Sequence, residues 1–231
     1  MNSGASKIKL KDKEYILDVA LLLVLIQIGR IIIKYIFLSQ LNFTYENVNI
    51  ANIISFMLVG ISIALFLRGS DMFNSAGQRL INLNNKYHNK NKRITLGVVT
   101  VLGIVISFYY EGGYFMTALT LLTLSLIIEP IFEEILFREY LWNYIGNYEK
   151  DDKKILIIIS ILSALFKIGY WDIISQNLSV IGSSSYTIDI VLTKVFLGLI
   201  VSLLLGVIKI KFKDTYLCIF VHSIVNIFIG R

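Results

Sequence analysis

Carboxylates and an arginine gather in one apolar stretch of the sequence, EPIFEEILFREYLW. The stretch contains Glu129, Glu133, Glu134, Arg138 and Glu139. Residues four apart lie on one face of a helix, so Glu134 can form an ion pair with Arg138. Glu133 lies on another face, which it shares with Glu129, and it needs its own partner. Each ionisable group in a membrane span costs about 2.5–3.5 kcal/mol, so these groups indicate function, although Glu134 and Glu139 would also suit a helix end at the headgroups.

A second polar pair lies near the C-terminal end, in the motif HSIVN. His222 and Asn226 are four residues apart within an apolar run, so they lie on one face of a helix. An imidazole and a carboxamide on one face can both donate hydrogen bonds into a cavity, as an oxyanion hole requires. The alternative is that a neighbouring helix simply satisfies the histidine.

Pro130 is the only proline in the chain, and it comes one turn before Glu133 and Glu134. It has no N–H to donate to the carbonyl of Leu126, and its ring clashes with that carbonyl. We therefore expect the helix to kink or unwind where the carboxylates begin.

Further candidate residues lie in the apolar runs between these motifs. Lys167 falls inside an apolar run, with Tyr170 and Trp171 near the outer end of that run. Aromatic residues at a helix end normally anchor it at the membrane interface. Lys194 lies in the next apolar run and is a candidate partner for a buried carboxylate.

The composition places these residues in a membrane protein. Of the 231 residues, 56% are hydrophobic and only 16% are charged, and the mean hydropathy is +0.71. Because about a quarter of the residues of a soluble domain are charged, we expect a bilayer as the solvent. The net charge of +6 comes from short clusters between apolar runs, which is typical of cytoplasmic loops and argues against nucleic-acid binding. The single cysteine, Cys218, cannot form a disulfide within the chain.

Continuous apolar runs predict an all-α, polytopic transmembrane bundle of about seven helices, with residues 1–231 as one domain. A helix needs about 20 apolar residues to cross the hydrocarbon core, and some runs are short enough for a tilted or re-entrant segment. The predicted spans are 15–38, 49–68, 94–110, 113–140, 154–171, 187–208 and 215–230. The first run is too long for a signal peptide and lacks a cleavage site, so we expect a retained helix.

The basic residues of the connections predict the orientation. Sixteen Lys and Arg residues lie in the N-terminal tail and in the connections 68–93, 141–154 and 209–214, and none in 39–48, 111–112 and 172–186. This asymmetry predicts a cytoplasmic N-terminus in a cell membrane. Arg30 and Lys34 oppose it, and we expect their side chains to snorkel outward. Residues 71–83 are either an amphipathic surface helix or a plain loop. The many Asn, Lys and Ile residues favour a bacterial origin.

The two motifs resemble those of a known family. PIFEEILFR is similar to motif 1, EExxxR, of the CAAX-protease and bacteriocin-processing family (CPBP, or Abi) of intramembrane endopeptidases, and HSIVN resembles its last motif, His-x-x-x-Asn/Asp. The resemblance covers about 125–230, and a family-like core would span about 94–230. It implies peptide hydrolysis by a glutamate and a histidine that activate water, without a covalent intermediate. We expect no cofactor.

The resemblance also implies a role for each matching residue. Glu133 would be the general base, and His222 and Asn226 would stabilise the oxyanion. Glu134 and Arg138 would form a supporting pair.

One position departs from the family pattern. Motif 2 of the family is Phe-x-x-x-His, whereas the matching residues here are Phe166 and Tyr170. A tyrosine, whose ordinary pKa is near 10, is a poor general base at neutral pH. The only other histidine, His88, lies in a predicted loop, and Glu139 stands where the family usually has glycine. With a single histidine in the spans, a typical zinc site is not expected.

Two functions therefore remain open. The first is a glutamate-type intramembrane peptidase that processes a small peptide, or a prenylated or bacteriocin-like substrate, or that confers self-immunity to a bacteriocin. The second is an inactive relative that acts as a membrane scaffold or immunity partner and binds another membrane protein. A transporter is disfavoured, because the chain shows no pair of interrupted helices in inverted repeats.

Overall fold

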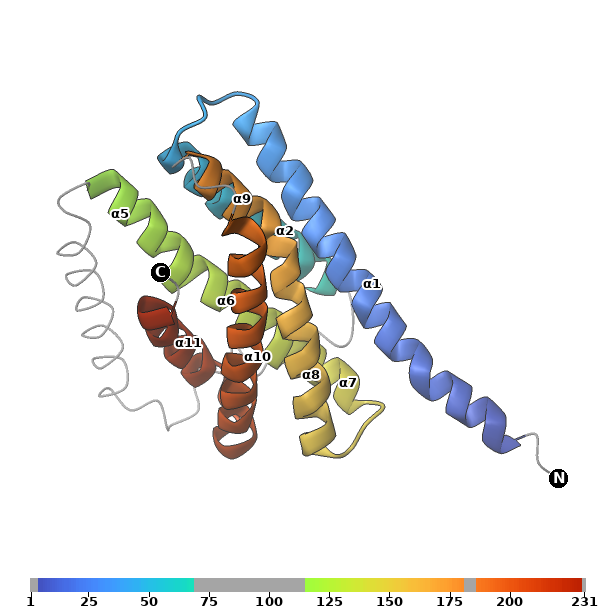
Figure 1. Ribbon diagram of the computed structural model, residues 1–231. Coiled ribbons are helices and arrows are strands. Elements are labelled where there is room, and N and C mark those ends of the chain that lie inside the picture. The colour runs from blue at the N-terminus through green and yellow to red at the C-terminus, as the bar shows by residue number, and fades with distance from the viewer. Residues whose placement is uncertain (1–3, 69–114, 181–185, 230–231) are drawn as a thin grey trace.

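The computed structural model describes residues 4–68, 115–180 and 186–229, and every regular element in those ranges is helical (Figure 1). Four of its helical segments are long and apolar enough to cross a membrane: Tyr15–Leu38, Tyr45–Ile63, Asp152–Ser179 and Thr187–Phe212. Thr215–Asn226 is a shorter apolar helix. The predicted all-α membrane bundle is therefore confirmed. The predicted span 94–110, the segment 71–83 and His88 lie outside the described residues.

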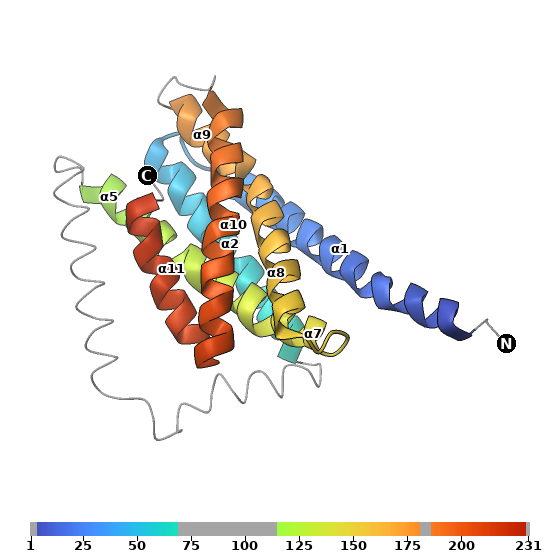
Figure 2. The same ribbon diagram turned by 60° about the horizontal axis from the view of Figure 1, so that its bottom comes forward.

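The N-terminal part of the chain is a pair of antiparallel helices. α1 (Gly4–Leu38) and α2 (Tyr45–Arg68) are joined by a short turn and pack along each other. The N-terminal end of α1 extends well beyond the other helices (Figures 1 and 2). The C-terminal half of α1 reaches α8, so it contributes to the interior of the bundle.

The helix with the carboxylate motif changes its winding several times. Its successive segments are α5 (Phe115–Leu122), η1 (Thr123–Ile128), α6 (Glu129–Glu134), η2 (Ile135–Leu141) and α7 (Trp142–Gly146). η1 and η2 are π-helical, so that the N–H of Glu129 donates to the carbonyl of Leu124, five residues earlier. Such widened turns are common at functional sites. The predicted irregularity at Pro130 thus takes the form of π-helical turns on both sides of α6.

The next membrane helix is longer than predicted. It comprises α8 (Asp152–Phe166), a 3₁₀ turn η3 (Lys167–Tyr170) and α9 (Trp171–Val180). The predicted end at residue 171 is wrong, since the helix continues to Val180. It continues because Ile173 and Ile174 are buried in the core and Asp172 has cationic partners there.

Two further helices close the bundle. α10 (Thr187–Phe212) runs beside α8 (Figures 1 and 2), and α11 (Thr215–Ile229) packs against η1, α6 and α10. The short turn between them contains Lys213, which has a φ of 51° and whose N–H donates to the carbonyl of Lys209 over 2.8 Å. This left-handed residue ends α10 and lets the chain reverse into α11.

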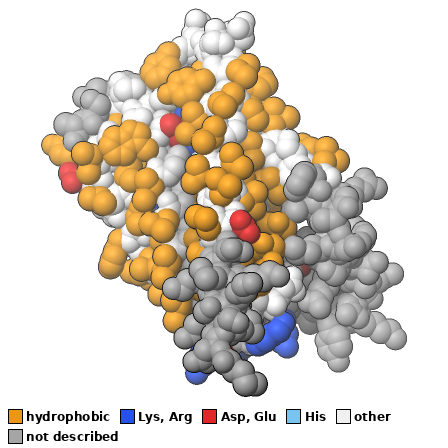
Figure 3. Space-filling view, turned by 90° about the vertical axis from the view of Figure 1, so that its right-hand side faces the viewer, with side chains coloured by type: hydrophobic (Ala, Val, Ile, Leu, Met, Phe, Trp, Pro, Cys, Tyr) orange, Lys and Arg blue, Asp and Glu red, His pale blue; other side chains and the backbone are white. Residues whose placement is uncertain are grey.

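The distribution of polar groups is that of a membrane protein. Hydrophobic side chains cover most of the described surface in Figure 3, and Leu17 is 71% exposed. Several charged side chains are instead buried, and Arg30 and Lys34 are 1% and 0% exposed. The expectation that these two side chains snorkel outward is wrong, because both pair with Asp172 on α9 inside the bundle.

Candidate active site

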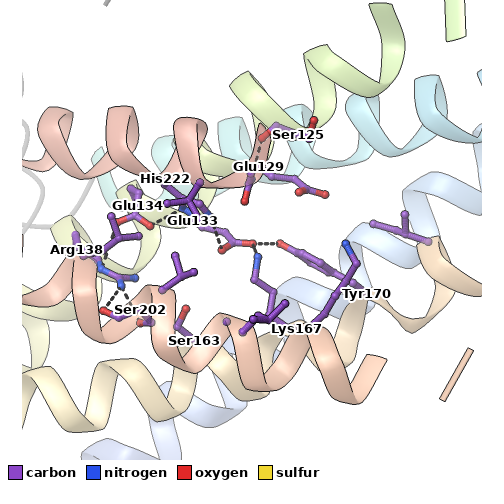
Figure 4. A pocket seen from close by; sticks show the side chains of 18 of the residues that line it. Ser125, Glu129, Glu133, Glu134, Arg138, Ser163, Lys167, Tyr170, Ser202 and His222 are labelled. Carbon is purple, nitrogen blue, oxygen red and sulfur yellow. Dashed lines mark hydrogen bonds and ion pairs between the residues drawn. The ribbon is translucent and has the colours of Figure 1, made fainter. Parts of the chain in front are cut away.

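A small polar cavity of about 100 Å³ lies between α6, η3, α10 and α11. Its lining includes residues of both sequence motifs, among them Asn226. Glu133, Glu134 and His222 are seen in Figure 4. The volume corresponds to about three water molecules at about 30 Å³ each. The cavity therefore suits water and a small reacting group.

Glu133 lies at the centre of the cavity wall and is 1% exposed. Its Oε1 accepts hydrogen bonds from Lys167 Nζ and from the Tyr170 hydroxyl, each over 2.5 Å. Both donors come from η3, where residues three apart stand above one another on the same side of a 3₁₀ turn. Glu133 therefore has its own partners, as its separate helix face predicted, and both belong to this turn. A lysine three residues before the motif 2 tyrosine was the signal for it.

Glu134 points away from Glu133 and is completely buried. Its Oε2 lies 3.2 Å from Arg138 Nε, so the ion pair predicted from their spacing is present. Arg138 also donates to the backbone carbonyl of Ser202 over 2.8 Å and to its hydroxyl over 2.7 Å. The pair thereby ties α6 and η2 to α10.

His222 joins the two carboxylates. Its Nδ1 lies 2.8 Å from Glu134 Oε1, and its Nε2 lies 4.0 Å from Glu133 Oε2. A carboxylate only accepts hydrogen bonds, so the nitrogen that faces Glu134 carries a proton. In the neutral ring, Nε2 then presents a lone pair toward Glu133 and the cavity.

The side chains of HSIVN also satisfy the backbone around Pro130. Pro130 has no N–H. The carbonyl of Leu126, four residues earlier, therefore loses its α-helical donor, and the carbonyl of Ser125, five residues earlier, loses its π-helical donor. Ser223 Oγ donates to the Leu126 carbonyl over 2.7 Å, and Asn226 Nδ2 donates to the Ser125 carbonyl over 2.8 Å. The last motif therefore docks α11 on the irregular helix and brings its histidine to Glu134.

Two further charges line the cavity without a direct partner. Glu129, one turn before Glu133, points into the space beside Ser125 in Figure 4. Lys194 projects from α10. Within the part of the chain that the structure describes, neither side chain forms a hydrogen bond or an ion pair. Lys194 thus faces the cavity, and the ion-pair partner of the buried carboxylate is Lys167 instead.

Other predicted residues lie outside the reacting centre. Glu139 accepts from Thr215 Oγ1 over 2.7 Å and pairs with Lys209 Nζ at 3.2 Å, so it fastens the turn between α10 and α11. Tyr170 is buried, and the expectation that it anchors the membrane interface is wrong, whereas Trp171 is exposed. Phe166 packs edge-on against the Tyr170 ring at 5.8 Å and supports it from below the cavity. Among the described residues no group of three His, Cys, Asp or Glu side chains could hold a metal ion.

The comparison with protein families agrees with the position of this cavity. Residues 115–228 match the family model described as Rce1-like, type II CAAX prenyl endopeptidase. This segment contains α5 to α11 and thus all the motif residues of the cavity. No curated protein and no solved structure matches the chain.

Proposed function

We propose, on the premise that residues 115–228 belong to the Rce1-like family of type II CAAX prenyl endopeptidases, that this membrane protein is an intramembrane peptidase. The observation that carries the proposal is the approach of Glu133 Oε2 and His222 Nε2 to 4.0 Å across the cavity. Both atoms accept hydrogen bonds in their unprotonated forms. Together they form a binding site for one water molecule.

The geometry of that site orients the water as a nucleophile. A water about 2.8 Å from each acceptor fits beside the 4.0 Å gap between Glu133 and His222, with an angle at its oxygen of about 90°. Both of its hydrogens then point to the protein, and its lone pairs face the cavity. A peptide carbonyl that enters the cavity would meet these lone pairs.

The hydrogen-bond partners of Glu133 and His222 give these two acceptors different roles. Glu133 already accepts from Lys167 and Tyr170, which weakens it as a base, so it orients the water. His222 is held by the Glu134 carboxylate, which accepts from Nδ1 and leaves Nε2 facing Glu133 as the nitrogen that can take a proton. The resemblance alone implied Glu133 as the base and His222 as an oxyanion donor. The contacts favour His222 as the group that takes the proton.

The reaction then proceeds by general acid–base catalysis. The water oxygen bonds to the carbonyl carbon while one of its protons passes to His222 Nε2. The imidazolium returns the proton to the amide nitrogen, and the carbon–nitrogen bond breaks to give a carboxylic acid and an amine. Asn226 uses one amide proton on the Ser125 carbonyl, and its second proton, with the Lys194 ammonium, is available to the oxyanion.

The substrate class is a small peptide, or a prenylated or bacteriocin-like chain, and self-immunity to a bacteriocin is the physiological role that goes with it. The description of the matching family as a CAAX prenyl endopeptidase supports the peptide and the prenylated chain, whereas the bacteriocin-like substrate and the self-immunity rest on the sequence resemblance alone. The apolar grooves of the bundle agree with a lipophilic substrate. One of them, of about 290 Å³ between α2 and α6, is lined by Phe56, Gly60 and Phe132.

A specific observation favours the second candidate, an inactive membrane scaffold. Oε1 of Glu133 already accepts hydrogen bonds from both Lys167 and Tyr170. In a scaffold, this ion pair would have only the structural role of joining the helices around the cavity. In that case the polar cavity would stabilise the bundle and another surface would bind the partner.

The deciding experiment compares peptide N-termini by mass spectrometry in cells that carry the wild type, Glu133→Gln or a deletion. We expect peptide termini that appear only with the wild type, because the amide lacks the charge that stabilises the His222 imidazolium. Asp152→Asn is the matched control, since it makes the same change at an exposed position. Identical profiles in all strains, together with a phenotype for the deletion that Glu133→Gln rescues, would contradict hydrolysis and support the scaffold.

A further inference from the structure

Two side chains of α1 contact the backbone of the turn that faces Glu133. Gln27 Nε2 donates to the carbonyl of Phe166 over 3.0 Å, and Arg30 Nη2 donates to the carbonyl of Gly169 over 2.7 Å. These carbonyls lie where the helix changes from α to 3₁₀ winding and back. Where the winding changes, regular helical hydrogen bonds are interrupted, and carbonyls need donors from elsewhere.

Arg30 is also fixed by several other groups. Its Nε donates to Gln27 Oε1 over 2.8 Å, and its Nη1 and Nη2 donate to the two oxygens of Asp172 over 3.2 and 2.5 Å. The guanidinium lies 5.5 Å from the centre of the Tyr170 ring. Arg30 therefore contacts the turn at its backbone, at the ring of Tyr170 and at the first residues of α9.

The charges at this place suggest that Arg30 has a task beyond charge balance. In the described ranges, Asp172 is the only carboxylate that pairs with Arg30 or with Lys34, so two buried cations share one anion. A second buried cation is costly unless it forms other interactions, and those of Arg30 are with the turn.

The packing of Gly169 shows how closely α1 holds the turn. A Cβ added at Gly169 would collide with the side chain of Gln27, so a larger residue fits at this position only if that side chain moves and gives up its present place against the turn. On the other side of the same turn, Lys167 and Tyr170 donate to Glu133. Gln27 and Arg30 thus hold one side of a turn whose other side holds Glu133.

We propose that Gln27 and Arg30 are positioning residues of the candidate active site, which hold the Lys167–Tyr170 turn in register with Glu133 from a helix outside the family-matched segment. The inference rests on the proposed function only insofar as Glu133 belongs to the reacting centre. It implies that residues 115–228 form an incomplete site without α1. It also places the two α1 residues in a supporting role, since neither lines the cavity.

A fluorine reporter on Tyr170 tests the proposal without a peptidase assay. The full-length chain with 3-fluorotyrosine at position 170 is studied in detergent by ¹⁹F NMR, and Glu133→Ala gives the resonance of a hydroxyl without its carboxylate. We expect Arg30→Met and Gln27→Leu to move the resonance most of the way to that position. Lys34→Met is the matched control. Lys34 lies one turn after Arg30 and pairs with the same carboxylate, so its loss removes the same charge, but Lys34 does not donate to the carbonyls of the turn.

The outcomes separate the two proposals. An unchanged resonance in folded Arg30→Met protein overturns the positioning role. If that variant does not fold, Arg30→Lys keeps the charge but cannot reach both Asp172 and the Gly169 carbonyl, and a wild-type resonance there overturns the role as well. On a peptide that the wild type cleaves, Arg30→Met should lower kcat on the order of 10²-fold with little change in KM. If the wild type cleaves no peptide, the proposed function fails, whereas the fluorine result still decides the positioning.

Discussion

Removal of Arg138 would leave the Glu134 carboxylate buried without its ion-pair partner. Both side chains are buried and lie 3.2 Å apart, and Arg138 also donates twice to Ser202. Loss of one partner of a buried pair costs about 3–5 kcal/mol. We expect Arg138→Met to lower the free energy of unfolding by about 3 kcal/mol, near the low end of this range, because His222 still donates to Glu134. For a chain of this size, that loss corresponds to a Tm lower by about 6–12 °C.

A double-mutant cycle tests the physical reason for that loss. Thermal unfolding of the wild type, Arg138→Met, Glu134→Gln and the double variant is measured in the same detergent. The double variant should recover much of the stability lost in Arg138→Met, because a neutral amide does not need a cation. Two additive losses would refute the reasoning, since they would show that the charges do not interact. A Tm for Arg138→Met equal to that of the wild type would refute it as well.

Three further predictions concern the motif 2 position, the last motif and a connection outside the membrane spans. Tyr170→His should increase peptide cleavage, because it places an imidazole where the family has one, and cleavage no faster than the wild type would contradict this reason. Ser223→Ala and Asn226→Leu should each destabilise the protein by about 1–3 kcal/mol in thermal unfolding, because a buried carbonyl loses its donor. The backbone N–H of Asp151 donates to Glu149 and lowers the pKa of that carboxyl, so NMR titration should place its midpoint below the ordinary value. The resulting stabilisation is present above the ordinary pKa and is lost as the pH falls through the lowered one.

Local spacing predicted the contacts that lie within one helix. Glu134 and Arg138 are four residues apart, and helical geometry alone brings them together. The helical bundle could also be predicted from the sequence, because a long apolar run in a membrane has few alternatives to a helix. The contact of His222 with Glu134 spans 88 positions, and only the family resemblance placed the two motifs in one site.

Contacts between distant helices were not accessible in this way. We expected Arg30 and Lys34 to snorkel outward, whereas their partner is Asp172, which lies in the range 172–186 that the apolar runs predicted as a connection. The periodicity of apolar and polar residues predicts which side chains share a face of a helix, but not which other helix that face contacts. The continuation of the helix past the 3₁₀ turn, which brings Asp172 inside, depends on the packing of α1 against that turn.

The proline of the carboxylate helix has a consequence for the timing of assembly. The donors for the carbonyls of Ser125 and Leu126 belong to α11, which the ribosome makes about 90 residues later than α6. Until α11 has entered the membrane, these two carbonyls lack the side-chain donors Ser223 and Asn226, and unsatisfied backbone groups are costly in lipid. The arrival of α11 therefore completes the backbone of the carboxylate helix and delivers His222 in the same step. A growing chain would carry the carboxylates through the translocation machinery without His222, and the candidate active site would be complete only when α11 is in place.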